Sequence, residues 1–170
     1  MTWGPGWRKL GLTVHVAASV GWIGAVVAYL GLVLAGLGSS DPQAVRSAWW
    51  GLDQLTGVLA PLSVAALVSG VVQALCTPWG LLRHYWVVMK LVLTAMATTV
   101  LLLTLPEVRA WAQWAAAGQN PDLHGQLLHP GVGLLVLLVI LVLSVYKPRG
   151  LTPYGERRLW ARLARVDEGE

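Results

Sequence analysis

The sequence predicts an all-α fold: an integral membrane four-helix transmembrane bundle with both termini cytoplasmic. Three observations lead to this prediction. Of the 170 residues, 56% are hydrophobic and 12% are charged, whereas an ordinary soluble domain carries roughly a quarter charged residues. Four segments are long and apolar enough for a helix to cross the ~30 Å hydrocarbon layer, which takes about 20 residues. The basic residues fall almost entirely on one side of these segments, as the positive-inside rule requires.

The four predicted spans fill most of the chain, so residues 1–170 form a single membrane domain. They cover about 12–37, 57–76, 85–105 and 127–146. The first span follows Arg8 and Lys9 but is far longer than the about 7–15 apolar residues of a secretory signal, which predicts a retained helix. The second contains Pro61, which predicts a kink, and the third carries one charge, Lys90.

The distribution of basic residues predicts the orientation. With the amino end inside, ten of the twelve basic residues lie on the inner side: Arg8, Lys9, Arg83, Lys90, Lys147, Arg149, Arg157, Arg158, Arg162 and Arg165. Only Arg46 and Arg109 remain outside. This predicts a multi-pass protein of the inner (cytoplasmic) cell membrane, with the lipid bilayer as its main partner.

The connections and the tail complete the predicted layout. Asp41-Pro42 reads as an N-cap with proline at the first helical position, so residues 43–52 form either a short helix or an extension of the second span. Pro106 begins a segment through residue 117 that resembles a helix lying on the outer surface. The basic tail, 147–170, contains an amphipathic pattern over 155–166 that predicts either a helix on the anionic inner leaflet or a solvated, frayed end.

Composition also excludes several classes of function. The basic residues are not interleaved with aromatic residues on a polar face, so nucleic acid is not a predicted partner. The single cysteine, Cys76, excludes a disulfide framework and a cysteine metal site. No catalytic motif and no carboxylate inside a predicted span is visible, which disfavours a proton-coupled pump. Glycines such as Gly21 and Gly24 permit close helix contacts within one chain or in a homodimer.

Polar residues within hydrocarbon are costly and commonly face the bundle interior or a cofactor. In the first span, polar and apolar residues recur every three or four positions and so lie on one face of the helix as a stripe: His15, Ser19, Trp22, Val26 and Tyr29. A second stripe follows the third span: Lys90, Thr94 and Thr98. Counting residues from the predicted boundaries places His15, Gln73, His84 and Lys90 in the inner leaflet.

The histidines at this depth suggest a metal or haem site. Neutral imidazole is a common metal ligand, and histidines on facing helices of a bundle can hold haem iron. His15 is the predicted axial ligand and His84 the candidate opposite it, and the nearby cations match the two haem propionates: Arg8, Lys9, Arg83 and Lys90. Against this stand plainer interpretations, in which His15 bonds a neighbouring serine or carbonyl, His84 is solvated at the interface and Lys90 snorkels to the headgroups. His124 and His129, near Asp122, are either a surface metal site or unrelated loop residues.

The first span carries a motif. Residues 15–24, His15-Val-Ala-Ala-Ser-Val-Gly-Trp22-Ile-Gly24, have the form H-x6-W-x-G. This resembles the motif of copper-resistance D-like membrane proteins, of the membrane family called domain of unknown function 2269 (DUF2269), and of HemJ-type protoporphyrinogen oxidases. The whole chain is most similar to DUF2269 in its actinobacterial form, and two other stretches carry the resemblance, residues 77–91 and 145–150.

The resemblance implies what the site holds. HemJ-type proteins are four-helix membrane proteins that bind haem b, and their third helix opens with W-x-H-x-K-L. Here Trp86, Lys90 and Leu91 match that pattern, whereas Val88 stands at the histidine and His84 lies one helical turn earlier.

Two functions are therefore predicted. The first is a haem b protein of electron transfer or haem metabolism, a haem-dependent oxidoreductase if it is an enzyme, with a membrane redox partner or quinone. Its predicted cofactor-binding residues are His15, Ser19, Trp22, Arg83, His84 and Lys90, with His15 and His84 as metal ligands. The alternative is a cofactor-free transport or accessory protein, in copper handling for example, although the chain has only three methionines and they do not cluster.

Overall fold

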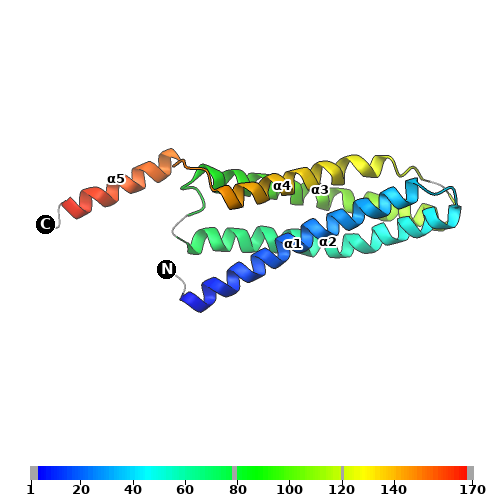
Figure 1. Ribbon diagram of the computed structural model, residues 1–170, viewed down its shortest axis with the longest axis horizontal. Coiled ribbons are helices and arrows are strands. Elements are labelled where there is room, and N and C mark those ends of the chain that lie inside the picture. The colour runs from blue at the N-terminus through cyan, green and yellow to red at the C-terminus, as the bar shows by residue number, and fades with distance from the viewer. Residues whose placement is uncertain (1–3, 78–79, 120, 168–170) are drawn as a thin grey trace.

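The protein is a bundle of four long helices followed by a shorter fifth helix (Figure 1). The computed structural model describes residues 4–77, 80–119 and 121–167. The helices are α1 (Pro5–Leu37), α2 (Pro42–Cys76), α3 (Tyr85–Ala116), α4 (Gly125–Tyr146) and α5 (Pro153–Asp167). Across these described ranges the only β pairing is an isolated bridge between His84 and Leu151. The predicted all-helical fold is confirmed.

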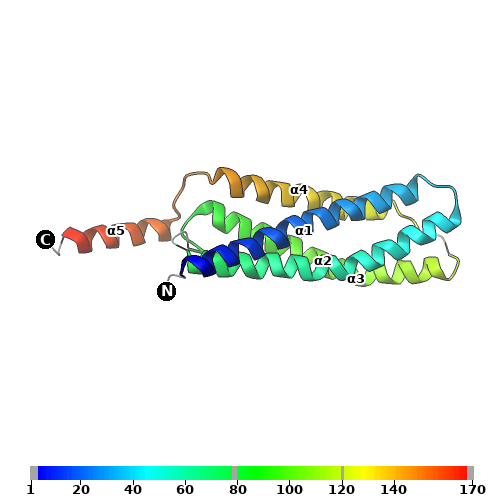
Figure 2. The same ribbon diagram turned by 60° about the horizontal axis from the view of Figure 1, so that its bottom comes forward.

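The four long helices form a closed ring. α1 packs against α2 and α4, and α3 packs against the same two helices. The start of α1 and all of α5 lie at one end of the bundle, and the α1–α2 and α3–α4 connections lie at the other (Figures 1 and 2). We call these the termini end and the loop end.

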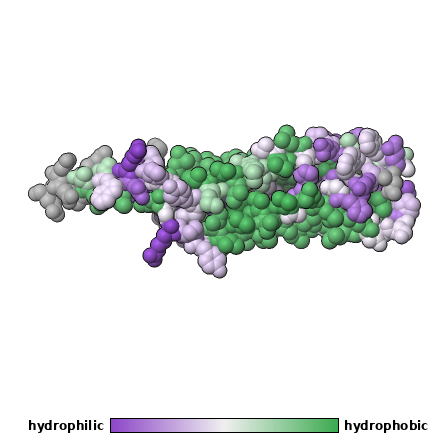
Figure 3. Space-filling model, turned by 90° about the horizontal axis from the view of Figure 1, so that it is seen from above, coloured by the Kyte–Doolittle hydropathy of each residue, from purple (hydrophilic) through white to green (hydrophobic). Residues whose placement is uncertain are grey.

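The surface of the bundle identifies its solvent. Apolar residues cover the middle of the visible face, and hydrophilic residues gather at the loop end and where α5 leaves the bundle (Figure 3). Large apolar side chains on this scaffold are widely exposed, for example Leu103 at 72% and Leu135 at 62%. All four long helices have the length and hydropathy needed to cross a bilayer. The protein is a multi-pass membrane protein, and these side chains face lipid.

The helix starts follow from local sequence. Proline is the first residue of α1, α2 and α5, a position at which the missing N–H is not needed and the fixed φ suits the helix. The Asp41 side chain caps α2 by accepting a hydrogen bond from the Gln43 backbone N–H at 2.9 Å. The predicted N-cap at Asp41-Pro42 is therefore confirmed, and residues 43–52 are an extension of α2.

The predicted surface helix after Pro106 is wrong. α3 continues through Pro106 to Ala116, and the last turns pack inward rather than lying on a surface. Val108 and Ala115 are buried in the core. Trp111 meets Trp49 of α2 edge to face, with ring centroids 5.5 Å apart. The extension of α2 covers the apolar face of this segment, and that packing favours one continuous helix despite the proline.

The core follows the stripe predicted on the first span. Trp22, Val26 and Tyr29 are all buried, as is Val33 beyond them. They pack with Trp49 and Leu52 of α2 in the loop-end half of the bundle. Toward the termini end the same α1 stripe continues through Ser19 and His15, which are half-buried. The polar part of the stripe therefore lies where the packing is looser.

The tail is helical, as one of the two sequence interpretations predicts. α5 makes no helix-to-helix contact with α1–α4 within the described residues, and Figure 1 shows it projecting from the termini end. Its start is fastened to the α2–α3 loop, because the Thr152 amide donates to the Arg83 carbonyl at 3.1 Å and the Tyr85 amide to the Gly150 carbonyl at 3.4 Å. The side chains of Arg162 and Arg165 lie outside the described part of the chain.

Candidate functional site

His15 joins α1 to α2 through its imidazole. Its Nδ1 lies 3.0 Å from the hydroxyl oxygen of Ser69. The Ser69 hydroxyl also donates to the carbonyl of Ala65 in its own helix. A hydroxyl has a single proton, so once Ser69 donates to Ala65 its oxygen must accept the hydrogen bond from His15 Nδ1–H. This tautomer leaves the lone pair on Nε2, the nitrogen through which a neutral histidine can bind a metal.

Gly70 makes room for this imidazole. A Cβ added at Gly70 would lie 3.1 Å from Cε1 and 3.9 Å from Nε2 of His15. The ring therefore sits directly against the α2 backbone, where a larger residue would displace it. Nearer the termini end, the Gln73 side-chain amide donates to the Gly11 carbonyl at 2.9 Å. His15, Ser69, Gly70 and Gln73 together define the α1–α2 polar seam.

A cavity of about 410 Å³ lies beside this seam. Ser69 and Gln73 are among its lining residues but expose no polar surface to it, and His15 does not line it. The rest of the wall is apolar and comes from the same two helices, with Trp7, Leu10, Val14, Val68 and Val72 among its residues. The α1–α2 polar seam thus borders an apolar space at the termini end.

Lys90 approaches the same region from α3. It is half-buried. The Lys90 Nζ also lies 5.7 Å from the centre of the Trp86 ring, a cation–π distance. Lys90 thus lies on α3, which is diagonal to α1 in the ring of helices.

The other predicted site residues occupy varied places. His84 is the N-cap residue of α3, and its ring lies 6.4 Å from that of Trp86. Within the described residues, no hydrogen bond or ring contact joins His84 to His15. Arg83 precedes it and accepts the Thr152 amide through its carbonyl. Ser19 is half-buried on α1, and Trp22 is a core residue.

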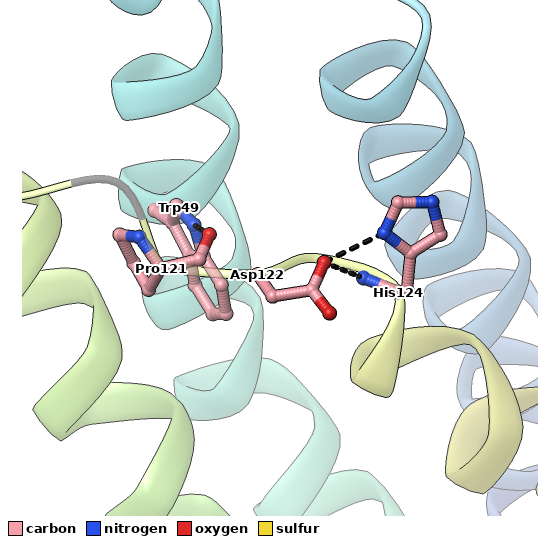
Figure 4. A network of polar contacts seen from close by, with 4 residues as sticks. All are labelled: Trp49, Pro121, Asp122 and His124. Carbon is pink, nitrogen blue, oxygen red and sulfur yellow. Dashed lines mark hydrogen bonds and ion pairs between the residues drawn. The ribbon is translucent and has the colours of Figure 1, made fainter.

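The loop end carries the remaining histidines. The His124 ring and backbone amide both contact one Asp122 carboxylate oxygen, at 2.6 and 2.9 Å (Figure 4). These hydrogen bonds, the backbone one foremost, lower the pKa of Asp122. His129 is exposed on the first turns of α4. In the part of the chain that the structure describes, no three His, Cys, Asp or Glu residues are grouped as a metal site, so the surface-metal interpretation gains no support.

The same end is held by contacts between distant segments. Trp49 of α2 donates its indole N–H to the Pro121 carbonyl at 3.4 Å (Figure 4). The Tyr29 hydroxyl of α1 donates to the Gln126 side chain of α4 at 2.6 Å. Tyr29, predicted as part of the polar stripe, is thus a structural link at the loop end rather than a neighbour of His15.

The plainer interpretation of His15, a hydrogen bond to a serine, is confirmed by Ser69, but the sequence did not identify which residues lie around the ring. Ser69 and Gly70 are visible as polar and small residues in the second span, but nothing in the sequence pairs them with His15. The available signal is their spacing with Gln73, since residues 69, 70 and 73 fall on one helical face. That face is where α2 meets α1.

Comparison with known proteins gives no match: no protein-family model, no curated protein and no solved structure matches the chain.

Proposed function

We propose that this protein is an integral membrane haem b-binding protein that works in electron transfer or haem metabolism, with His15 as an axial ligand. The observation that carries the proposal is the hydrogen bonding of His15. Its Nδ1 is committed to Ser69, which orients the ring and keeps the lone pair on Nε2. Histidine ligands of metals usually have their second nitrogen held in this way. A structural bond to serine and a role as a ligand are therefore compatible.

The surroundings of His15 suit a haem in several respects. Gly70 lets the imidazole lie against α2, and an apolar cavity borders the same seam although His15 does not line it. Lys90 of α3 is proposed to balance the negative charge of a propionate. Arg83, Arg8 and Lys9 are the further cations proposed to pair with propionates, with the termini end facing the cytoplasm. When bound, haem would supply one-electron redox chemistry, with a potential set by the axial ligand and the polarity around it.

His84 is the proposed second ligand. Its ring, at the start of α3, lies 6.4 Å from that of Trp86, and Lys90 Nζ lies over the same Trp86 ring. The replacement of the HemJ-type histidine by Val88 makes His84 the nearest imidazole on the third helix to that motif position. Ser19 and Trp22 continue the His15 stripe and are proposed to line the face of the pocket toward the core. The resemblance of residues 15–24 to HemJ-type and DUF2269 proteins supports the same assignment.

The test is the visible spectrum of the purified protein. The full chain, expressed with a haem precursor and purified in detergent, is expected to show a Soret band and to change on reduction with dithionite. His15→Ala should remove most of the haem, whereas His129→Ala, a matched change at an exposed histidine of the loop end, should leave it in place. His84→Ala should retain haem but alter its spectrum. A colourless protein would favour the cofactor-free transport or accessory function instead.

A further inference from the structure

A second cavity lies on another face of the bundle, between α2 and α3. It has a volume of about 500 Å³. Thr56, Gly57 and Ala60 of α2 form one wall, and Leu102, Leu105 and Pro106 belong to the other. Arg109 and Gln113 extend the α3 wall toward the loop end. The residues proposed to hold haem do not line this space, so a ligand bound here is independent of haem.

Two prolines leave backbone acceptors in this cavity's walls. Pro61 has no N–H, so the carbonyl of Gly57 lacks its usual donor four residues later. Pro106 also has no N–H, so the carbonyl of Leu102 likewise lacks its usual donor. Gly57 has no side chain, so its main chain itself forms the wall, and a Cβ added there would meet nothing within 4 Å. Each wall therefore includes a residue whose carbonyl oxygen has lost its helical hydrogen bond.

The cavity lies near the membrane boundary of the loop end. α4 has 22 residues, about 33 Å at 1.5 Å per residue, which is one bilayer crossing. Its second residue, Gln126, bonds Tyr29 of α1, and a Cβ at Gly51 of α2 would touch Leu32 of α1. Residues 51–57 of α2 are thus near the level at which α4 enters the bilayer. Leu102 is 41% exposed, so the cavity opens toward lipid.

The charges beside the cavity offset each other in part. Arg109 Nε lies 3.7 Å from the Asp53 carboxylate oxygen Oδ1, with side chains that are 70% and 25% exposed. Arg109 is the one charged residue among those that line the cavity, and Asp53, outside the lining, offsets part of its charge. The Asp53 oxygen is also buried without a hydrogen-bond partner in the described structure. The cavity therefore suits an uncharged ligand that donates hydrogen bonds, because backbone acceptors inside a membrane have no water to satisfy them.

We infer that this α2–α3 cavity binds the ring of a quinol, a lipid-soluble molecule with hydroxyl donors at opposite ends of a flat ring. One hydroxyl would donate to the carbonyl of Gly57 and the other to that of Leu102. The ring would occupy the apolar space around Ala60 and Leu105, and the tail would leave between the helices into lipid. The oxidised quinone has carbonyl oxygens instead of hydroxyls and cannot make these bonds, so the site selects the reduced form.

The test is anaerobic calorimetric titration of the full chain in detergent with trimethylhydroquinone and, separately, with trimethylbenzoquinone. Saturable binding of the quinol is expected, at least about tenfold tighter than binding of the quinone, which is 1.4 kcal/mol. Gly57→Leu, which fills the cavity without a backbone clash, should weaken quinol binding at least tenfold. Gly31→Leu is the matched control, because a Cβ at Gly31 also meets nothing within 4 Å, and it should bind as the parent does.

Leu102→Trp provides a second, independent obstruction from the α3 wall, in case Gly57→Leu does not fold. Equal affinity for the two redox forms would overturn the inference, as would unchanged binding in both obstructed variants. Competition by decanol as effective as that of the quinol would also overturn it, because the site would then accept any apolar alcohol. Haem content plays no part in these measurements, so a colourless protein that binds quinol would refute only the haem proposal.

Discussion

Replacing Ser69 by alanine tests the hydrogen bond on which the site depends. The change removes the acceptor 3.0 Å from His15 Nδ1 and also the bond of Ser69 to its own helix. Ser144→Ala is the matched control, because Ser144 bonds the Ile140 carbonyl at 2.8 Å in the same local way. A net hydrogen bond contributes about 0.5–1.5 kcal/mol, and side-chain bonds between membrane helices average about 0.6 kcal/mol. Ser69→Ala should therefore lower the free energy of unfolding by about 0.6–1.5 kcal/mol more than Ser144→Ala.

The assay is reversible unfolding in mixed micelles with a denaturing detergent, followed by the fluorescence of the ten tryptophans. In a His15→Leu background the interhelical bond is already absent, so Ser69→Ala should then cost no more than Ser144→Ala. The difference between the two backgrounds measures the coupling of the pair. An equal effect of Ser69→Ala in both backgrounds would refute the bond, and with it the assignment of the lone pair to Nε2.

Three further predictions concern separate parts of the chain. Gly70→Ala should displace the His15 ring by a few tenths of an ångström, because the new Cβ would lie 3.1 Å from Cε1. Haem occupancy, measured by absorbance, should therefore fall. Unchanged occupancy would contradict the packing of His15 against Gly70. Gly155→Ala should loosen the start of α5, because its Cβ would collide with a backbone carbonyl of the α2–α3 loop. Trypsin should then cleave the tail faster, and an unchanged cleavage rate would count against the contact between α5 and that loop. The pKa of Asp122 is lowered, so its bonds to His124 stabilise the fold above pH 3.8 and are lost as the pH falls through that lowered pKa. The Asp122 carboxyl ¹³C resonance should therefore titrate with a midpoint below 3.8. A higher midpoint would contradict the contact.

The membrane bundle could be predicted because its signals are local. Apolar run length predicted the four spanning helices, and the step of three or four residues along the first span predicted the buried face of Trp22, Val26 and Tyr29. The proline at residue 42 also predicted the start of α2. The proline at residue 106 misled, because tertiary packing of Trp111 on Trp49 outweighs the local tendency to break the helix.

The partners within the site could not be predicted in the same way. His15 and Ser69 are 54 residues apart, and their contact depends on the register between α1 and α2. That register is set by side-chain packing along both helices, for example where Gly21 meets Leu62. Periodicity shows which face of each helix is polar, but not which residues on two such faces lie at the same level.

The visible spectrum of the detergent-purified protein tests the proposed haem site most directly. We predict a Soret band that shifts on reduction in the parent protein and in His129→Ala, and that is largely lost in His15→Ala. A parent protein without a Soret band, after expression with a haem precursor, would contradict the proposed function. Full haem occupancy with an unchanged spectrum in His15→Ala would contradict the ligand assignment.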